Sequence, residues 1–122
     1  MGYQTDFSGE FEITPELTAK QVAALKAFAE ERHEGADERG TTYPELYCQW
    51  VPSDDGTVLE WDQGEKFYSY VEWLDYLIER FFVPWGHTLD GSVIWEGEER
   101  DDMGTITVEN NVVTTKVATI TW

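Results

Sequence analysis

The chain is short and strongly acidic, with 122 residues that include 25 Asp and Glu against 8 Lys and Arg, a formal net charge of −17. This balance argues against direct binding of nucleic acid or of anionic membranes, because both need basic surfaces, and it favours basic proteins as partners. Hydrophobic residues make up 41% of the chain and aromatic residues 15%. That composition excludes a disordered chain, and with the chain length it predicts one folded domain over residues 1–122. The elements described below make this an α+β domain.

Residues 3–13 form the first predicted element, a half-buried β-strand. Apolar side chains alternate with polar ones, and a period of two places the two sets on opposite faces of a sheet. Three carboxylates, those of Asp6, Glu10 and Glu12, fall on the polar face. Alternate residues of a strand lie about 6.6 Å apart, which is close to the spacing of phosphates along a nucleic-acid strand.

A helix is predicted to follow this strand. Thr18 is its expected N-cap and Gln21 the capping-box partner. Apolar residues then recur at helical spacing. Gly35 is the expected end of the helix, and residues 35–44 have the composition of a loop.

Short strands account for much of the remaining chain. Residues 46–51 and 57–61 are expected to pair as a hairpin, because the segment between them is rich in turn-forming residues. Residues 92–96 form a further predicted strand. Residues 105–108 and 112–121 flank a tight turn of Asn residues and are expected to form the last hairpin.

The second helix has the clearest pattern in the chain. Asp62 is its expected N-cap, apolar residues recur at steps of three and four, and Pro84 and Gly86 end it. Trp73 and Tyr76 fall beside the main apolar stripe. The opposite face carries an acidic stripe made of Glu65, Glu72, Asp75 and Glu79.

The predicted order of elements is β-α-β-β-α-β with further strands after it. This order matches a ferredoxin-like antiparallel sheet, covered by two helices on one face, with an added C-terminal β-hairpin. The other sheet face would be open to water or to a partner. Trp50, Trp61 and Trp95 are not all expected to point to the covered face, so the extra aromatics are interpreted either as interface anchors on the open face or as a second small core under the last hairpin.

Two kinds of segment contain possible metal ligands: acidic runs and the surroundings of the two histidines. The run from Glu96 to Asp102 and the turn at Asp54 lack the ligand ladder of a calcium loop. His33 and His87 have no second His at a zinc-binding spacing, and both are expected at the surface. We therefore expect no metal ligands and no cofactor.

Catalytic signatures are also missing. The chain has no nucleophile elbow, phosphate loop or dinucleotide fingerprint. Cys48 lies in a predicted strand and suits a packing position better than a reactive one. Glu60 and Asp62 are the carboxylate pair to inspect first for acid–base chemistry, but such pairs are inevitable in so acidic a chain. We expect no catalytic residues.

Tryptophan-rich motifs give the chain a resemblance to a known family. LYCQWVPSDDGTVLEWD runs from Leu46 to Asp62, EKFYSYVEWL from Glu65 to Leu74, and Pro-Trp-Gly follows at residues 84–86. With the opening MGYQTDFSG, this pattern resembles a family of small acidic proteins encoded by tailed bacteriophages and prophages. The resemblance covers most of the chain apart from the loop before Pro44. It implies a phage context and transfers no functional residue.

A non-enzymatic binding function is favoured by these features. The expected partner is a basic host protein, and the sharpest form of the hypothesis is a nucleic-acid mimic that inhibits host defence, as anti-CRISPR proteins do. The single cysteine and the polar N-terminus predict a cytoplasmic protein without a signal peptide, here in an infected or lysogenic bacterial host. The residues expected at the partner surface are Asp6, Glu10, Glu12, Glu65, Glu72, Asp75, Glu79, Glu98, Glu99, Asp101 and Asp102.

Two other functions remain open. A small structural or assembly protein could self-associate through its open sheet face or through the edge formed by residues 112–122. An enzyme with a cleft that the sequence does not reveal is the third possibility. The acidic residues alone do not separate these functions.

Overall fold

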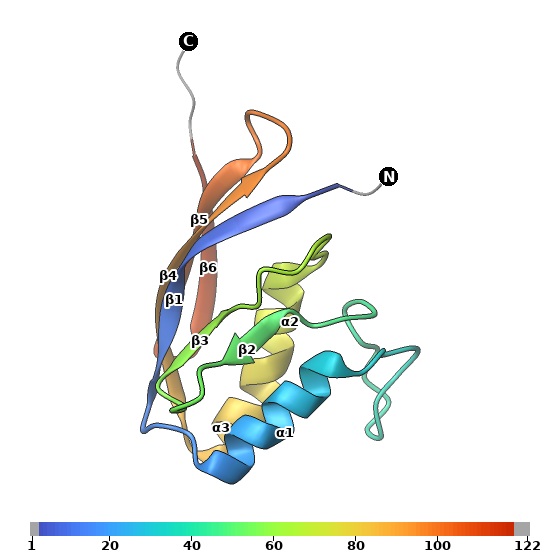
Figure 1. Ribbon diagram of the computed structural model, residues 1–122, viewed down its shortest axis with the longest axis vertical. Helices are drawn as coiled ribbons and strands as arrows, with labels where there is room; N and C mark the ends of the chain where they lie inside the picture. Colours follow the sequence, from blue (N-terminus) through green and yellow to red (C-terminus); the bar gives the residue numbers. More distant parts are fainter. Residues whose placement is uncertain (1–2, 119–122) are drawn as a thin grey trace.

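The computed structural model describes residues 3–118 and contains a six-stranded antiparallel sheet with its helices on one face (Figure 1). The strands lie in the order β2-β3-β1-β4-β5-β6. The expected α+β class, with one helix-covered and one open sheet face, is confirmed. In chain order the elements are β1 (Thr5–Thr14), α1 (Ala19–Glu30), β2 (Trp50–Pro52), β3 (Val58–Trp61), α2 (Tyr70–Leu77), η1 (Ile78–Phe82), α3 (Val83–Trp85), β4 (Thr88–Gly97), β5 (Met103–Glu109) and β6 (Val112–Val117).

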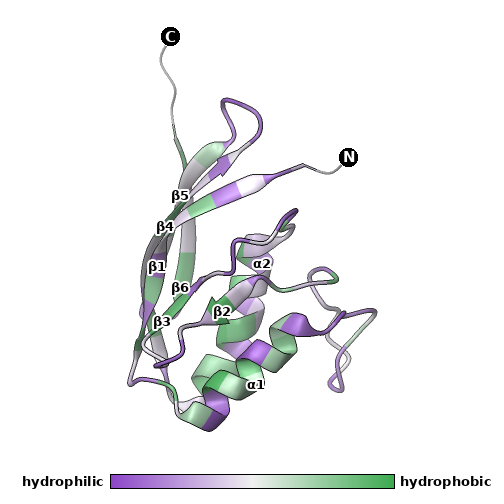
Figure 2. Cartoon of the chain, in the orientation of Figure 1, coloured by the Kyte–Doolittle hydropathy of each residue, from purple (hydrophilic) through white to green (hydrophobic). Residues whose placement is uncertain are grey.

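Strand β1 has the alternating burial that its sequence predicts. Phe11 is fully buried, whereas Asp6, Glu10 and Glu12 are exposed. Figure 2 shows the same alternation of hydrophobic and hydrophilic residues along β1. The strand pairs with β4 along its whole length, so its polar face becomes the centre of the open sheet face.

Helix α1 begins as predicted and ends early. The Oγ1 of Thr18 accepts from the backbone N–H of Gln21 at 3.1 Å, and the Gln21 Oε1 accepts from the Thr18 N–H at 3.0 Å. The helix ends at Glu30, so the expected end at Gly35 is wrong. The chain leaves the helix at Glu31, which is extended with φ −81° and ψ 145°. The Phe28 carbonyl oxygen of the last turn accepts from the Glu31 N–H at 3.2 Å and lies 2.8 Å from the His33 Nε2.

The second helix begins later than predicted, at Tyr70. Residues 62–69 are irregular, and Gln63, Lys66 and Ser69 have positive φ angles there. Asp62 is not the N-cap: its Oδ1 accepts from the backbone N–H of Gly64 at 2.7 Å in a turn. The Asp62 and Glu65 pair, which has the spacing of a helix cap, therefore lies in a turn and loop before the helix.

The end of this helical segment is close to the prediction. The chain passes from α2 into the π-helical turn η1 and then into α3, which contains Pro84. Proline has no N–H with which to continue the α-helical ladder, and a π-helical turn accommodates that loss. Gly86 ends the segment with φ 82°, as expected.

The predicted hairpins form with shifted ends. Strand β2 begins at Trp50, so the prediction that residues 46–49 belong to this strand is wrong. The last hairpin turns at Asn110 and Asn111, both with positive φ. Strand β6 ends at Val117, and the predicted continuation to Thr121, like the edge to Trp122, falls on residues 119–122, outside the described residues.

Trp50, Trp61 and Trp95 all belong to one core on the covered face. Phe7 contacts the rings of Trp50, Trp61 and Tyr70 with centroids 5.0–5.3 Å apart. Trp95 is buried in the same cluster as the apolar residues of β5. The sequence-based alternatives, aromatic anchors on the open face or a second small core, are therefore both wrong.

Trp73 and Tyr76 are buried as well, although they lie beside the main apolar stripe of α2. The loop that follows α1 covers this second side of the helix. His33 and Tyr43 from that loop contact the Trp73 ring at 5.5 and 6.4 Å between centroids. Within residues 3–118, no helix is long and apolar enough to span a membrane.

Candidate functional site

Carboxylates from two central strands face one another on the open side of the sheet. In the ladder between β1 and β4, Asp6 lies directly opposite Glu96, and Glu12 lies directly opposite Asp90. Side chains opposite each other in an antiparallel pair have Cβ atoms about 4.5–5.5 Å apart, and like charges at this distance destabilise the sheet. None of these four carboxylates forms an ion pair within residues 3–118. The two central strands therefore carry negative charge, without a cationic partner among the described residues, toward both of their ends, and of these carboxylates Asp90 also accepts from the backbone N–H of Asn110 at 2.7 Å.

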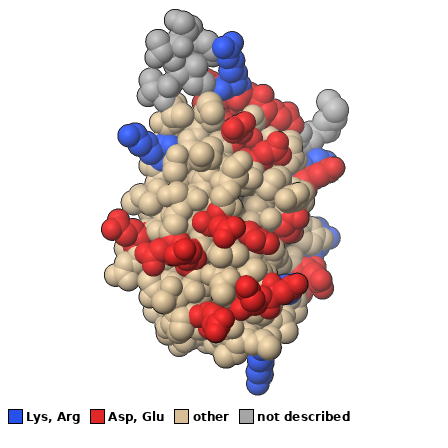
Figure 3. Space-filling view, turned by 60° about the vertical axis from the view of Figure 1, so that its left-hand side comes forward, with Lys and Arg blue, Asp and Glu red and all other residues tan. Residues whose placement is uncertain are grey.

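A row without acidic side chains separates the two acidic pairs. Ser8, Ile94 and Thr105 lie side by side in neighbouring strands, and Lys116 of β6 continues the row. The Ile94 side chain is 47% exposed. Figure 3 shows acidic side chains in separate groups with uncharged surface between them. A single exposed apolar residue is ordinary on a protein surface, so the acidic side chains around Ile94 are what distinguish this face.

Glu60 of β3 extends the acidic area toward the edge of the sheet that is formed by the short strand β2. It lines a shallow hollow of about 250 Å³ together with Glu10 and Gly9. Gly9 has a φ of 107°, and a Cβ atom there would lie 2.7 Å from the Ser92 carbonyl oxygen. Glycine is thus required for β1 and β4 to approach beside Glu10. Asp62, which the sequence paired with Glu60 as the carboxylates to inspect first, does not line this hollow.

The turn between β4 and β5 adds acidic side chains at one end of this face. Glu98, Glu99 and Asp101 are exposed, and the Glu98 Oε1 accepts from the backbone N–H of Gln4 at 2.7 Å. Asp102 differs from its neighbours because it is half-buried and accepts hydrogen bonds from the Tyr3 hydroxyl at 2.7 Å and from the Trp95 Nε1–H at 3.0 Å. Its carboxylate holds the turn in place.

The acidic stripe of the second helix lies on a different side of the molecule. Glu72, Asp75 and Glu79 are exposed on the helical layer, which covers the opposite face of the sheet from Asp6 (Figure 1). Partial burial, followed by the charges of Glu72 and Glu79, raises the pKa of Asp75. Glu65 precedes the helix and lies in the irregular loop, contrary to the prediction. The expected partner residues therefore do not form one continuous surface.

Three residues of the open face were not expected at a partner surface: Asp90, Glu96 and Ile94. Their outward direction follows from the alternation of β4, in which Leu89, Val93 and Trp95 are buried. That alternation was available in the sequence, but the residues opposite them depend on which strands pair. One sequence does not determine that register.

The other groups considered for chemistry are structural. Burial raises the pKa of the Cys48 thiol to about 12, which suits a packing residue. Both histidines are buried, not at the surface as expected: His87 bonds the Pro15 carbonyl oxygen through Nδ1 at 2.7 Å, and His33 bonds the end of α1. Among the described residues, no three His, Cys, Asp or Glu side chains gather to hold a metal ion.

Comparisons with protein-family models, with curated proteins and with solved structures gave no match to this chain.

Proposed function

We propose that the chain is a non-enzymatic phage accessory protein that binds a basic host protein through the open face of its sheet. The observation that carries the proposal is the pair of directly opposed carboxylates, Asp6 with Glu96 and Glu12 with Asp90. Each such pair costs stability in the free protein, by roughly 0.2–1 kcal/mol. Cationic side chains of a partner remove that cost when they bind, so the strained arrangement favours association with a basic surface.

Nucleic-acid mimicry is the form of binding that this geometry supports best. The acidic side chains repeat along β1 and across to β4, and thereby make a two-dimensional array of negative charge around Ile94. A groove that neutralises phosphates with Lys and Arg would accept such an array. We propose inhibition of host defence as the result of this mimicry.

The fold assignment that accompanies this proposal is ferredoxin-like with an added hairpin. It is supported by the order β2-β3-β1-β4, which is entirely antiparallel, and by the two strands added beside β4. In this arrangement the helices occupy one face and leave the other free for a partner.

A matched pair of double variants tests the proposal. Asp6→Asn with Glu12→Gln alters the sheet face, and Glu72→Gln with Glu79→Gln removes the same charge from the helical layer. The immobilised full-length chain is exposed to bacterial lysate at low and then moderate salt, and retained proteins are challenged with duplex DNA. We expect a basic protein that DNA displaces and that only the sheet variant fails to retain. Equal loss with both variants, or no basic partner at low salt, would refute the proposal.

Self-association is a second candidate, favoured by the edge strand β6. Val112 and Val117 on this strand are 62% and 65% exposed, and its outer edge has no paired strand among the described residues. An open edge of this kind is a template for another chain. The edge is a better route than the open face, because two acidic faces repel each other. Light scattering over micromolar concentrations tests this candidate, and a monomer throughout would exclude it.

A further inference from the structure

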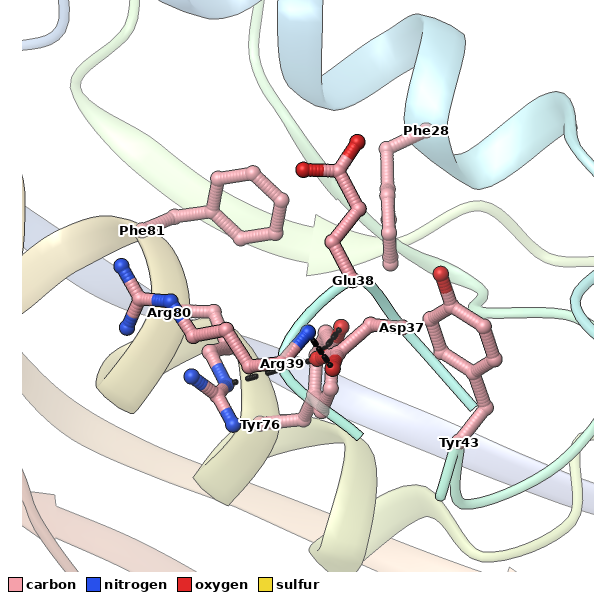
Figure 4. Close-up of a pocket in the computed structure, with 8 residues that line it drawn as sticks. All are labelled: Phe28, Asp37, Glu38, Arg39, Tyr43, Tyr76, Arg80 and Phe81. Atoms are coloured by element: carbon pink, nitrogen blue, oxygen red, sulfur yellow. Dashed lines mark hydrogen bonds and ion pairs between the residues drawn. The ribbon is translucent and has the colours of Figure 1, made fainter. Parts of the chain in front are cut away.

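A second concave site lies on the helical side of the molecule, away from the acidic sheet face. It is a pocket of about 380 Å³ between α1, the end of α2 with η1, and the loop that follows α1 (Figure 4). Four aromatic rings line it: Phe28, Tyr43, Tyr76 and Phe81. Phe28 and Tyr76 are nearly parallel, with an interplanar angle of 15°. The volume falls in the range of small-molecule sites, about 300–1,000 Å³.

Asp37 closes one side of the pocket and is fully used by the protein. Its carboxylate accepts from the Tyr76 hydroxyl at 2.8 Å and from the backbone N–H groups of Thr41 at 2.9 Å and Arg39 at 3.0 Å. Burial acts to raise the pKa of Asp37, but these hydrogen bonds and the charge of Arg80 outweigh it and hold that pKa below the ordinary value. Asp37 thus anchors the loop to α2.

Arg80, in contrast, has unused donors. Its Nε is buried, lies 3.5 Å from the Asp37 Oδ2 and has no hydrogen-bond acceptor, while Nη2 donates to the Thr41 hydroxyl. Its Nη1 has no acceptor within residues 3–118. The buried Nε thus keeps the ion pair with Asp37 but no hydrogen bond among the described residues, and Nη1 is the donor of Arg80 that remains for a ligand.

Arg39 brings a second guanidinium to the same pocket. It is exposed and forms no ion pair within the described part of the chain. Figure 4 shows the guanidinium groups of Arg39 and Arg80 on the same side of the pocket. The chain has only 8 Lys and Arg, and two of them line this pocket together with the carboxylates of Asp37 and Glu38. The pocket is therefore balanced in formal charge, whereas the chain as a whole is strongly acidic.

We propose that this pocket binds a small aromatic anion. A planar ring packs against Phe28 and Phe81, and the oxygens of a carboxylate or phosphate accept from Arg39 and Arg80. Aromatic side chains favour offset or edge-on packing with such a ring, and a guanidinium favours the planar, bidentate oxygens of these anions. This site is independent of the acidic sheet face and of any partner bound there.

Trp73 provides a reporter behind the pocket wall. Its ring lies 5.8 Å from Phe28 and 5.5 Å from Tyr76, measured between centroids, and its buried indole N–H has no acceptor within residues 3–118. The full chain labelled with ¹⁵N is titrated with adenosine 5′-monophosphate or phenylacetate, and with adenosine or 2-phenylethanol as uncharged counterparts. Trp73→Phe assigns the indole signal. We expect saturable shifts of this signal with at least one anion and not with its counterpart, and the anion that saturates identifies the headgroup.

Two charge-removing substitutions at the pocket rim should change the affinity for the anion in opposite directions. Arg39→Gln should weaken binding of the anion by roughly fivefold, as expected for an exposed charge. Glu38→Gln should strengthen it, because a carboxylate lining the same pocket repels the anion. Both residues are exposed, so the variants should fold, which their HSQC spectra check. Absence of saturable shifts up to about 10 mM, equal shifts from the uncharged compounds, or unchanged affinity in Arg39→Gln overturns the proposal.

Discussion

The ring of His87 joins the end of the helical segment to the start of α1 through Gln21. The His87 Nε2 lies 2.9 Å from the Gln21 Oε1, the same oxygen that accepts from the backbone N–H of Thr18 in the capping box. The other ring nitrogen bonds the Pro15 carbonyl oxygen. One amide oxygen therefore completes a helix cap and contacts a buried histidine ring. Both oxygens beside the ring are acceptors, so each contact is a hydrogen bond when the ring nitrogen facing it carries a proton.

Gln21→Ala should destabilise the protein by about 1–2 kcal/mol, because it removes half of a capping box and leaves a buried ring nitrogen unpaired. The midpoint of urea unfolding measures this change. Lys20→Ala, at the exposed neighbouring position of the same helical turn, is the control and should change the midpoint little. Equal effects of the two substitutions would show that neither the capping-box bond nor the His87 contact contributes to stability.

Local patterns predict the parts of this fold that depend on neighbours in sequence. The period of two in β1 and the Thr18 cap of α1 are of this kind, because each is satisfied within a few residues. The start of α2 is not. Asp62 and Glu65 have the spacing of a cap, but the chain uses them in a loop with three positive φ angles, at Gln63, Lys66 and Ser69.

The candidate site shows the same division. The polar face of β1 follows from alternation, so Asp6 and Glu12 could be identified from the sequence. Their neighbours Glu96 and Asp90 could not, because they are brought opposite β1 by strand pairing. The pocket lined by Arg39 and Arg80 also depends on the loop that follows α1 and folds over α2. The sequence of that loop has no periodic pattern that would predict this contact.

Asp75→Asn should stabilise the protein at pH 7 by about 0.5 kcal/mol, because it removes like-charge neighbours at i−3 and i+4. The pKa of Asp75 is raised in the folded state, by burial first and then by Glu72 and Glu79. The folded state therefore binds the proton more readily than the unfolded state, and stability is lost as pH rises from the ordinary Asp value through the raised one.

The gain from this substitution should accordingly shrink as pH falls through the raised pKa toward the ordinary Asp value of about 4, because the wild-type carboxyl takes up its proton over that range. Urea unfolding at several pH values measures the difference. Glu109→Gln, an exposed residue at the end of β5, controls for the general loss of one negative charge. A gain that is constant from pH 4 to 7 contradicts the assignment.

Gly9→Ala should destabilise the protein by about 2 kcal/mol or more, because alanine is disfavoured at positive φ and its Cβ meets the Ser92 carbonyl oxygen. Gly40→Ala is a useful comparison, since Gly40 has a φ of 84° but open space around it. The difference between the two variants isolates the close approach of β1 and β4. Similar losses of stability would mean that the backbone angle alone matters.

Cys48 should be unreactive in the native protein. It is 1% exposed, and burial raises its thiol pKa to about 12, so very little reactive thiolate is present at neutral pH. Ellman's reagent should label the thiol at the rate of unfolding and at once in concentrated urea. Rapid labelling of the native protein at pH 7 would show that the β2 end of the core opens readily.

The acidic sheet face should be a source of instability in the free protein. Asp6→Asn with Glu12→Gln removes one carboxylate from each opposed pair and should raise the free energy of unfolding by about 1 kcal/mol at low salt. Salt screens such repulsion over distances of about 10 Å at 0.1 M, so the gain should fall as sodium chloride is added. Glu16→Gln with Glu109→Gln removes the same charge elsewhere and should gain less. If the sheet variant gains no more than this control, the opposed carboxylates are not strained, and the proposal that a basic partner relieves them loses its physical basis.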